Sequence, residues 1–116
     1  MLVYSIVLFA LAALFGLYLI ARVFGGRLPP WPAAILHGLL AASGLLILLY
    51  AAFVAGGVPF PVTVAALLLV IAALGGFVLV SFHARQQLPP KPLAAIHALA
   101  AVAGFLTLCG SVFGLL

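Results

Sequence analysis

Histidine is the residue type in this chain whose chemistry and spacing together suggest a functional site. Two of the 3 histidines, His37 and His97, stand sixty positions apart in the same pattern, A-x-x-H-x-x-x-A-x-x-G. A neutral imidazole ligates haem iron, hydrogen-bonds a quinone carbonyl or relays a proton near neutral pH. Because the surroundings of the two histidines match, we expect them to share one role.

The small residues near each histidine lie on the same helical face. The two patterns consist of Ala34, His37, Ala41 and Gly44 in the first copy, and of Ala94, His97, Ala101 and Gly104 in the second. Spacings of three, four and three residues bring such a set to one side of a helix. The resulting face is a shallow groove with one polar group, which can receive a neighbouring helix or a flat cofactor.

The two patterns belong to a longer internal repeat. Residues 28–48 and 88–108 are identical at 11 of 21 aligned positions without a gap, more than shared composition explains. Identities at the same sixty-residue spacing also occur upstream, among them Ala12 with Ala72 and Gly16 with Gly76. We therefore expect a tandem duplication of a helical hairpin, with repeats at 1–57 and 61–116 in a single domain.

The composition predicts a protein of the lipid bilayer. Hydrophobic residues fill 70% of the 116 positions, and the chain has 4 basic and 0 acidic residues. A spanning helix needs about 20 apolar residues, so we expect an all-α polytopic membrane protein with four spans, at 2–24, 32–55, 61–82 and 93–115. The lack of carboxylates excludes the usual acid–base, phosphate-loop and magnesium enzymes, and so few charges argue against a nucleic-acid partner.

The basic residues predict the orientation of the chain. Arg22, Arg27, Arg85 and Lys91 all lie at the connections that follow the first and third spans. The positive-inside rule puts these connections in the cytoplasm of a bacterial inner membrane and both termini on the outer, periplasmic side. The paired histidines then share one depth, about 7.5 Å into the helix at a rise of 1.5 Å per residue.

One hypothesis for the pair is a b-type haem between the second and fourth spans. His37 and His97 would be its two axial metal ligands. The small residues of the two patterns would leave space for the macrocycle, and Arg27 and Lys91 would pair with the haem propionates.

The hydrogen bonds of the two imidazoles belong to the same hypothesis. The carbonyls four residues before each histidine, at Ala33 and Leu93, would orient the rings as metal-bound imidazoles require. His83 has no counterpart in the first repeat, where Val23 takes its place. At a helix exit, His83 is expected to reach the membrane interface without a special duty.

Three alternatives use the same residues differently. The small stripes and imidazoles can serve helix packing alone. They can also form a quinone or proton site at the cytoplasmic edge, or part of a small transporter, although the spans lack the charged sites that substrate coupling normally uses.

The chain's size and composition favour a subunit over a free-standing enzyme. We expect a non-catalytic accessory or anchoring subunit of an electron-transfer or bioenergetic complex, embedded in lipid and bound to other membrane subunits. The competing class is a structural subunit without a cofactor.

Overall fold

The computed structural model describes residues 1–116 and is entirely helical, which confirms the all-α class. Its elements are α1 (Leu2–Phe24), α2 (Trp31–Leu49), a π-helical segment η1 (Tyr50–Ala55) that continues α2, α3 (Phe60–Ala84) and α4 (Lys91–Val112). All four α-helices, α2 taken together with η1, are long and apolar enough to cross a membrane, as a multi-pass membrane protein requires.

Proline and glycine set the ends of these helices. Helices α2, α3 and α4 each carry a proline in the first turn, where the missing N–H has no helical partner to lose. Helix α4 ends at Val112, earlier than the predicted residue 115. Gly114 adopts a left-handed conformation with φ of 74°, and the Leu115 N–H donates to the Gly110 carbonyl at 2.7 Å. This closure turns the chain away from the helix axis.

The second predicted span is continuous but changes its winding near the end. The Gly56 N–H donates to the Ala51 carbonyl five residues earlier, at 3.1 Å, which is the spacing of a π-helix. Gly56 and Gly57 then adopt φ of 72° and 75°, a region that glycine enters without steric cost. The two glycines therefore allow the tight connection into α3.

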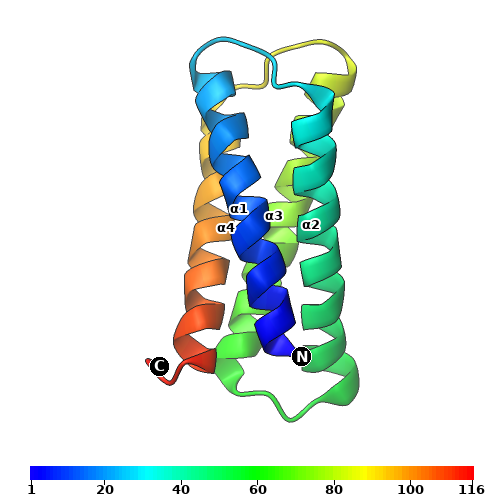
Figure 1. The fold of residues 1–116 in the computed structure, drawn as a ribbon. Coiled ribbons are helices and arrows are strands. Elements are labelled where there is room, and N and C mark those ends of the chain that lie inside the picture. Colours follow the sequence, from blue (N-terminus) through cyan, green and yellow to red (C-terminus); the bar gives the residue numbers. More distant parts are fainter.

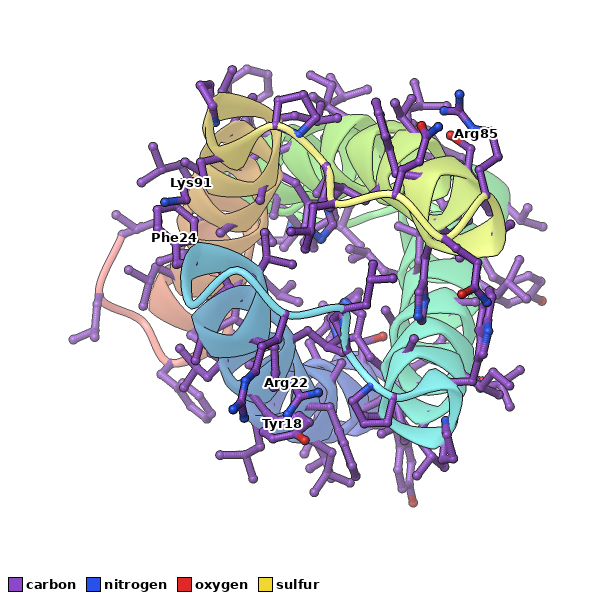
Figure 2. The ribbon with its side chains drawn as sticks, turned by 90° about the horizontal axis from the view of Figure 1, so that it is seen from above. Tyr18, Arg22, Phe24, Arg85 and Lys91 are labelled. Atoms are coloured by element: carbon purple, nitrogen blue, oxygen red, sulfur yellow. The ribbon has the colours of Figure 1, made fainter.

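The four helices form an antiparallel bundle. Figure 1 shows the α1–α2 and α3–α4 connections at one end, and the two termini with the α2–α3 connection at the other. Seen along the bundle, each helix packs against two neighbours, and α2 stands diagonally opposite α4 (Figure 2). The bundle measures 43 × 21 × 19 Å.

Apolar packing is concentrated in the half of the bundle that contains the termini. The hydrophobic core cluster comprises Ile6, Phe9, Leu48, Val62, Ala65, Ala66, Leu69 and Leu108. These positions lie near the start of α1 and α3 and near the end of α2 and α4. In the half toward the α1–α2 and α3–α4 connections, the buried side chains are fewer and include Val23, His83 and Ala94.

Large apolar side chains cover the outside of every helix. Leu14 is 65% exposed, Leu46 68%, Leu74 59% and Leu106 60%. Contiguous apolar surface on this scale marks contact with a membrane or with another protein. The large apolar residues are thus not confined to the core, and the apolar exterior is the surface expected of helices surrounded by lipid.

Candidate functional site

His37 and His97 face each other between the diagonal helices α2 and α4. Their ring centroids are 6.2 Å apart and the ring planes are inclined by 78°, so one ring presents its edge to the other. Both residues are half-buried. The two imidazoles therefore lie against one another inside the bundle.

Each imidazole is fixed by a backbone carbonyl of its own hairpin partner. The Nδ1 of His37 lies 2.8 Å from the Ala12 carbonyl oxygen of α1, and the Nδ1 of His97 lies 2.6 Å from the Ala72 carbonyl oxygen of α3. A carbonyl oxygen only accepts hydrogen bonds, so each Nδ1 must carry the proton. In the neutral imidazole this leaves the Nε2 lone pair of both histidines free to accept a proton or bind a metal.

These carbonyls differ from the ones expected four residues before each histidine. The Nδ1 atoms reach across to the preceding helix, and Ala33 and Leu93 do not supply the acceptors. The physical reason is a glycine on the neighbouring helix at the level of each ring. A Cβ on Gly16 would lie 3.1 Å from Cε1 of His37, and a Cβ on Gly76 would lie 3.2 Å from Cε1 of His97.

The spacing of four residues from Ala12 to Gly16, repeated at Ala72 and Gly76, was the sequence signal for these contacts. In a helix, the residue four positions after a carbonyl donates to it and lies beside it. Glycine at that position lets a second donor approach the same oxygen. This spacing predicts only that α1 and α3 pack closely against a neighbouring helix. It does not indicate that the neighbouring group is an imidazole.

The small residues beyond each histidine pack inside the hairpins. A Cβ on Gly44 would meet Phe9 at 3.2 Å, and a Cβ on Gly104 would meet Leu69 at 2.7 Å. Ala41 and Ala101 are half-buried, one turn beyond the histidines. The space assigned to a macrocycle at the two glycines is therefore filled by side chains of α1 and α3.

The two cations expected to pair with haem propionates, Arg27 and Lys91, lie at the end of the bundle with the α1–α2 and α3–α4 connections. Neither contacts the imidazoles. Lys91 stands over the ring of Phe24, with its Nζ 5.9 Å from the ring centroid, and Figure 2 shows both on the outside of the bundle. Arg27 is exposed and borders a hollow on the surface with Tyr18 and Arg22.

His83 lies in the last turn of α3, at the helix exit as expected, but its ring is buried and does not extend outward. It is 9% exposed, as is Val23 at the equivalent place in the first half. Its ring stacks on Trp31, with centroids 3.9 Å apart and planes inclined by 21°. This contact joins the end of α3 to the start of α2, so His83 holds the two hairpins together at one corner of the bundle.

The ligand set of the chain restricts which metal centres are feasible. No group of three or more His, Cys, Asp or Glu residues could hold a metal ion. A bare ion such as zinc takes three or four protein ligands, whereas haem iron already has four ring nitrogens and needs only one or two more. Two facing imidazoles alone therefore do not supply the ligand set of a bare zinc ion.

Comparisons with protein families, with curated proteins and with solved structures found no match to this chain. The functional conclusion therefore depends on the geometry of the paired histidines.

Proposed function

We propose that this protein is a small integral membrane subunit of an electron-transfer complex, and that it binds haem b between α2 and α4 with His37 and His97 as axial ligands. The single observation that carries the proposal is the pair of facing imidazoles, each with Nδ1 hydrogen-bonded to a carbonyl and Nε2 free. The same Nδ1–H contact commonly fixes the ring of a metal-bound histidine.

The separation of the rings supports this ligand pair. With ring centroids 6.2 Å apart, the two imidazoles are close enough that both would hold the same haem. When bound, the haem would supply one-electron transfer. The chain's own contribution is to hold both imidazoles in a fixed orientation through the Nδ1 hydrogen bonds.

The uneven packing of the bundle also favours a cofactor at this level. The hydrophobic cluster ends near Phe9 and Leu69, on the terminal side of the histidines. Toward the α1–α2 and α3–α4 connections, fewer side chains are buried, so adding a flat group there displaces less packed core. Arg27 and Lys91 are at this end. Because Lys91 lies over Phe24 and Arg27 lines the outer hollow, the histidines alone carry the haem proposal.

Membrane insertion, orientation and gene duplication form part of the same proposal. We place the helices in a bacterial inner membrane with the basic connections in the cytoplasm and both termini outside. Repeats at 1–57 and 61–116 are supported by matching contacts, since Ala12 with His37 and Ala72 with His97 pair in the same way at a spacing of sixty residues. The apolar exterior provides contact area for lipid and for partner subunits.

A cofactor-free structural subunit is the second candidate, and one specific observation favours it. The space beside Gly44 and Gly104 is occupied by side chains of their own hairpins. The stripes of small residues therefore already serve helix packing. In that case the facing imidazoles are polar contacts within the bundle.

An optical spectrum separates the two candidates. The protein is purified in mild detergent from cells supplied with a haem precursor, and reduced-minus-oxidised spectra are recorded for wild type, His37→Ala and His97→Ala. The haem proposal expects sharp α and Soret bands that either substitution abolishes or shifts. His83→Ala is the matched control, because it removes the third imidazole and should leave the bands unchanged. A monodisperse, helical wild-type protein that stays colourless after titration with haemin would refute haem binding.

A further inference from the structure

The outer surface of the first hairpin has a hollow lined by two arginines. Its volume is about 330 Å³, and Tyr18, Ala21, Arg22, Gly25 and Arg27 line it. Tyr18 and Arg22 lie together on the outside of α1 in Figure 2. The hollow is therefore distinct from the region between the histidines and opens to the surroundings of the bundle.

Arg22 has hydrogen-bonding capacity that the chain does not use. Its Nη2 donates to the Leu28 carbonyl at 3.0 Å, which holds the guanidinium against the α1–α2 connection. Its Nε is buried and has no hydrogen-bond partner. The chain contains no Asp or Glu, so no acidic side chain of this protein can neutralise Arg22 or Arg27. Arg22 and Arg27 line the same hollow, and two guanidinium groups at one site are suited to a phosphate.

A second, apolar hollow adjoins the first. Its volume is about 350 Å³, and it is lined by Leu14, Phe15, Tyr18 and Ala33. Tyr18 borders both hollows. Leu14 precedes Arg22 by eight residues, about 12 Å along the helix at 1.5 Å per residue. The apolar hollow thus lies deeper along α1, toward the middle of the bundle, and the arginines lie near its end.

We propose that these two hollows form a binding site for one acidic phospholipid. Arg22 and Arg27 bind the phosphate, and part of one acyl chain lies along Leu14, Phe15 and Ala33 between α1 and α2. The order of the hollows, cationic at the helix end and apolar toward the middle, matches the order of headgroup and chain in a bilayer. This site depends on the proposed membrane insertion but not on haem binding, so the two proposals can fail separately.

The second hairpin lacks the same site. The positions equivalent to Tyr18, Arg22 and Arg27 are Val78, Phe82 and Gln87. Arg85 is the basic residue at this corner, and its guanidinium stands over the Phe82 ring, 4.8 Å from the centroid. Figure 2 shows Arg85 on the opposite side of the bundle from Arg22. Arg85 therefore provides a matched control with the same charge, at the same end and outside the hollow.

Native mass spectrometry of the detergent-purified full chain tests the site. The protein is titrated with anionic phosphatidylglycerol and, separately, with zwitterionic phosphatidylcholine of the same acyl-chain length. We expect one tightly retained phosphatidylglycerol per chain. Affinity should fall about fivefold in Arg27→Gln, which corresponds to about 1 kcal/mol for one basic residue. Arg85→Gln should bind like wild type. Because Arg27 is exposed and its side chain is not part of the packed core, Arg27→Gln should still fold even if Arg22→Gln does not.

Two further arms separate a lipid from a free phosphate and complete the test. Ala33→Phe fills the apolar hollow and should weaken the binding of phosphatidylglycerol. It should not change the concentration at which inorganic phosphate competes for the site. If inorganic phosphate alone displaces the lipid at equal concentration, the site binds free phosphate and the lipid assignment is wrong. Equal binding of the two lipids, or an equal loss in Arg85→Gln and Arg27→Gln, would also overturn the proposal.

Discussion

Gly16 of α1 lies directly against the imidazole of His37 on α2. A Cβ on Gly16 would stand 3.1 Å from Cε1 of the ring, and the equivalent separation between Gly76 and His97 is 3.2 Å. The same rings donate to the Ala12 and Ala72 carbonyls. The absence of a side chain on one helix thus sets the position and the hydrogen bond of an imidazole on the next helix.

The first prediction concerns this glycine contact. In Gly16→Ala the ring must move by a few tenths of an ångström, which weakens its bond to the Ala12 carbonyl and costs about 1 kcal/mol of unfolding free energy. Gly16→Val should cost more and displace the ring. The His37 Nδ1 resonance in ¹⁵N NMR, together with unfolding in a mixed detergent series, measures both effects.

Gly38→Ala is the control for this prediction. Gly38 lies in α2 next to His37, and an added Cβ there meets no atom within 4 Å. This substitution should leave the His37 resonance unchanged and stabilise the helix slightly. A similar resonance shift in Gly16→Ala and Gly38→Ala would show that Gly16 does not position the imidazole.

The second prediction compares two equivalent glycines in helix packing. A Cβ on Gly104 would approach Cγ of Leu69 to 2.7 Å, whereas a Cβ on Gly44 would approach Phe9 only to 3.2 Å. Cγ of leucine is a branch point close to the backbone and moves less easily than the edge of a ring. Gly104→Ala should therefore destabilise the bundle by about 2 kcal/mol, within the range for overpacking, and Gly44→Ala should cost less.

Relief of the clash checks this explanation. In the double variant Gly104→Ala with Leu69→Ala, the loss should be smaller than the sum of the two single losses, because the substitutions share one contact. Unfolding in a mixed detergent series gives all four free energies. Additive losses would mean that Leu69 is not what excludes a side chain at Gly104.

The helices themselves were predictable from the sequence. The first predicted span, 2–24, coincides with α1 (Leu2–Phe24), since apolar composition and the following Gly25 and Gly26 define it without help from the rest of the fold. The fourth span was predicted too long. Whether Val112 or a later residue ends α4 depends on the closure between Leu115 and Gly110, a local contact that hydropathy does not report.

The partners of the histidines were only half predictable. The equal sequence spacing indicated that His37 and His97 would lie at the same depth, and in the structure their ring centroids are 6.2 Å apart. The acceptors at Ala12 and Ala72 were missed, since a one-helix pattern gives no information on which carbonyl of the neighbouring helix is nearest. The burial of the His83 ring was missed for the same reason, because it depends on Trp31, fifty-two residues away.

The third prediction concerns that contact between hairpins. Trp31 and His83 stack at 3.9 Å between ring centroids, and such aromatic pairs contribute about 0.5–1.5 kcal/mol beyond the area they bury. A double-mutant cycle with Trp31→Ala and His83→Ala should give a coupling free energy in this range. Arg85→Gln combined with Trp31→Ala is the control cycle, because Arg85 contacts Phe82 of its own helix. A coupling near zero in the first cycle would show that the stacking does not bind the hairpins.

The fourth prediction is that one substitution makes the protein more stable. Ser5 is 0% exposed, and its Oγ has no hydrogen-bond partner. A buried hydroxyl without a partner costs about 1–3 kcal/mol relative to a satisfied one. Ala65, at the equivalent position of the second hairpin, is also 0% exposed, so the same depth in the bundle accepts a methyl group.

Ser5→Ala should therefore raise the unfolding free energy by about 1 kcal/mol, and the reciprocal Ala65→Ser should lower it. Both are measured by unfolding in detergent, with Ser43→Ala as the control, since the exposed Ser43 hydroxyl donates to the Leu39 carbonyl of its own helix. A loss of stability in Ser5→Ala would mean that the Ser5 hydroxyl has a favourable partner in the folded protein.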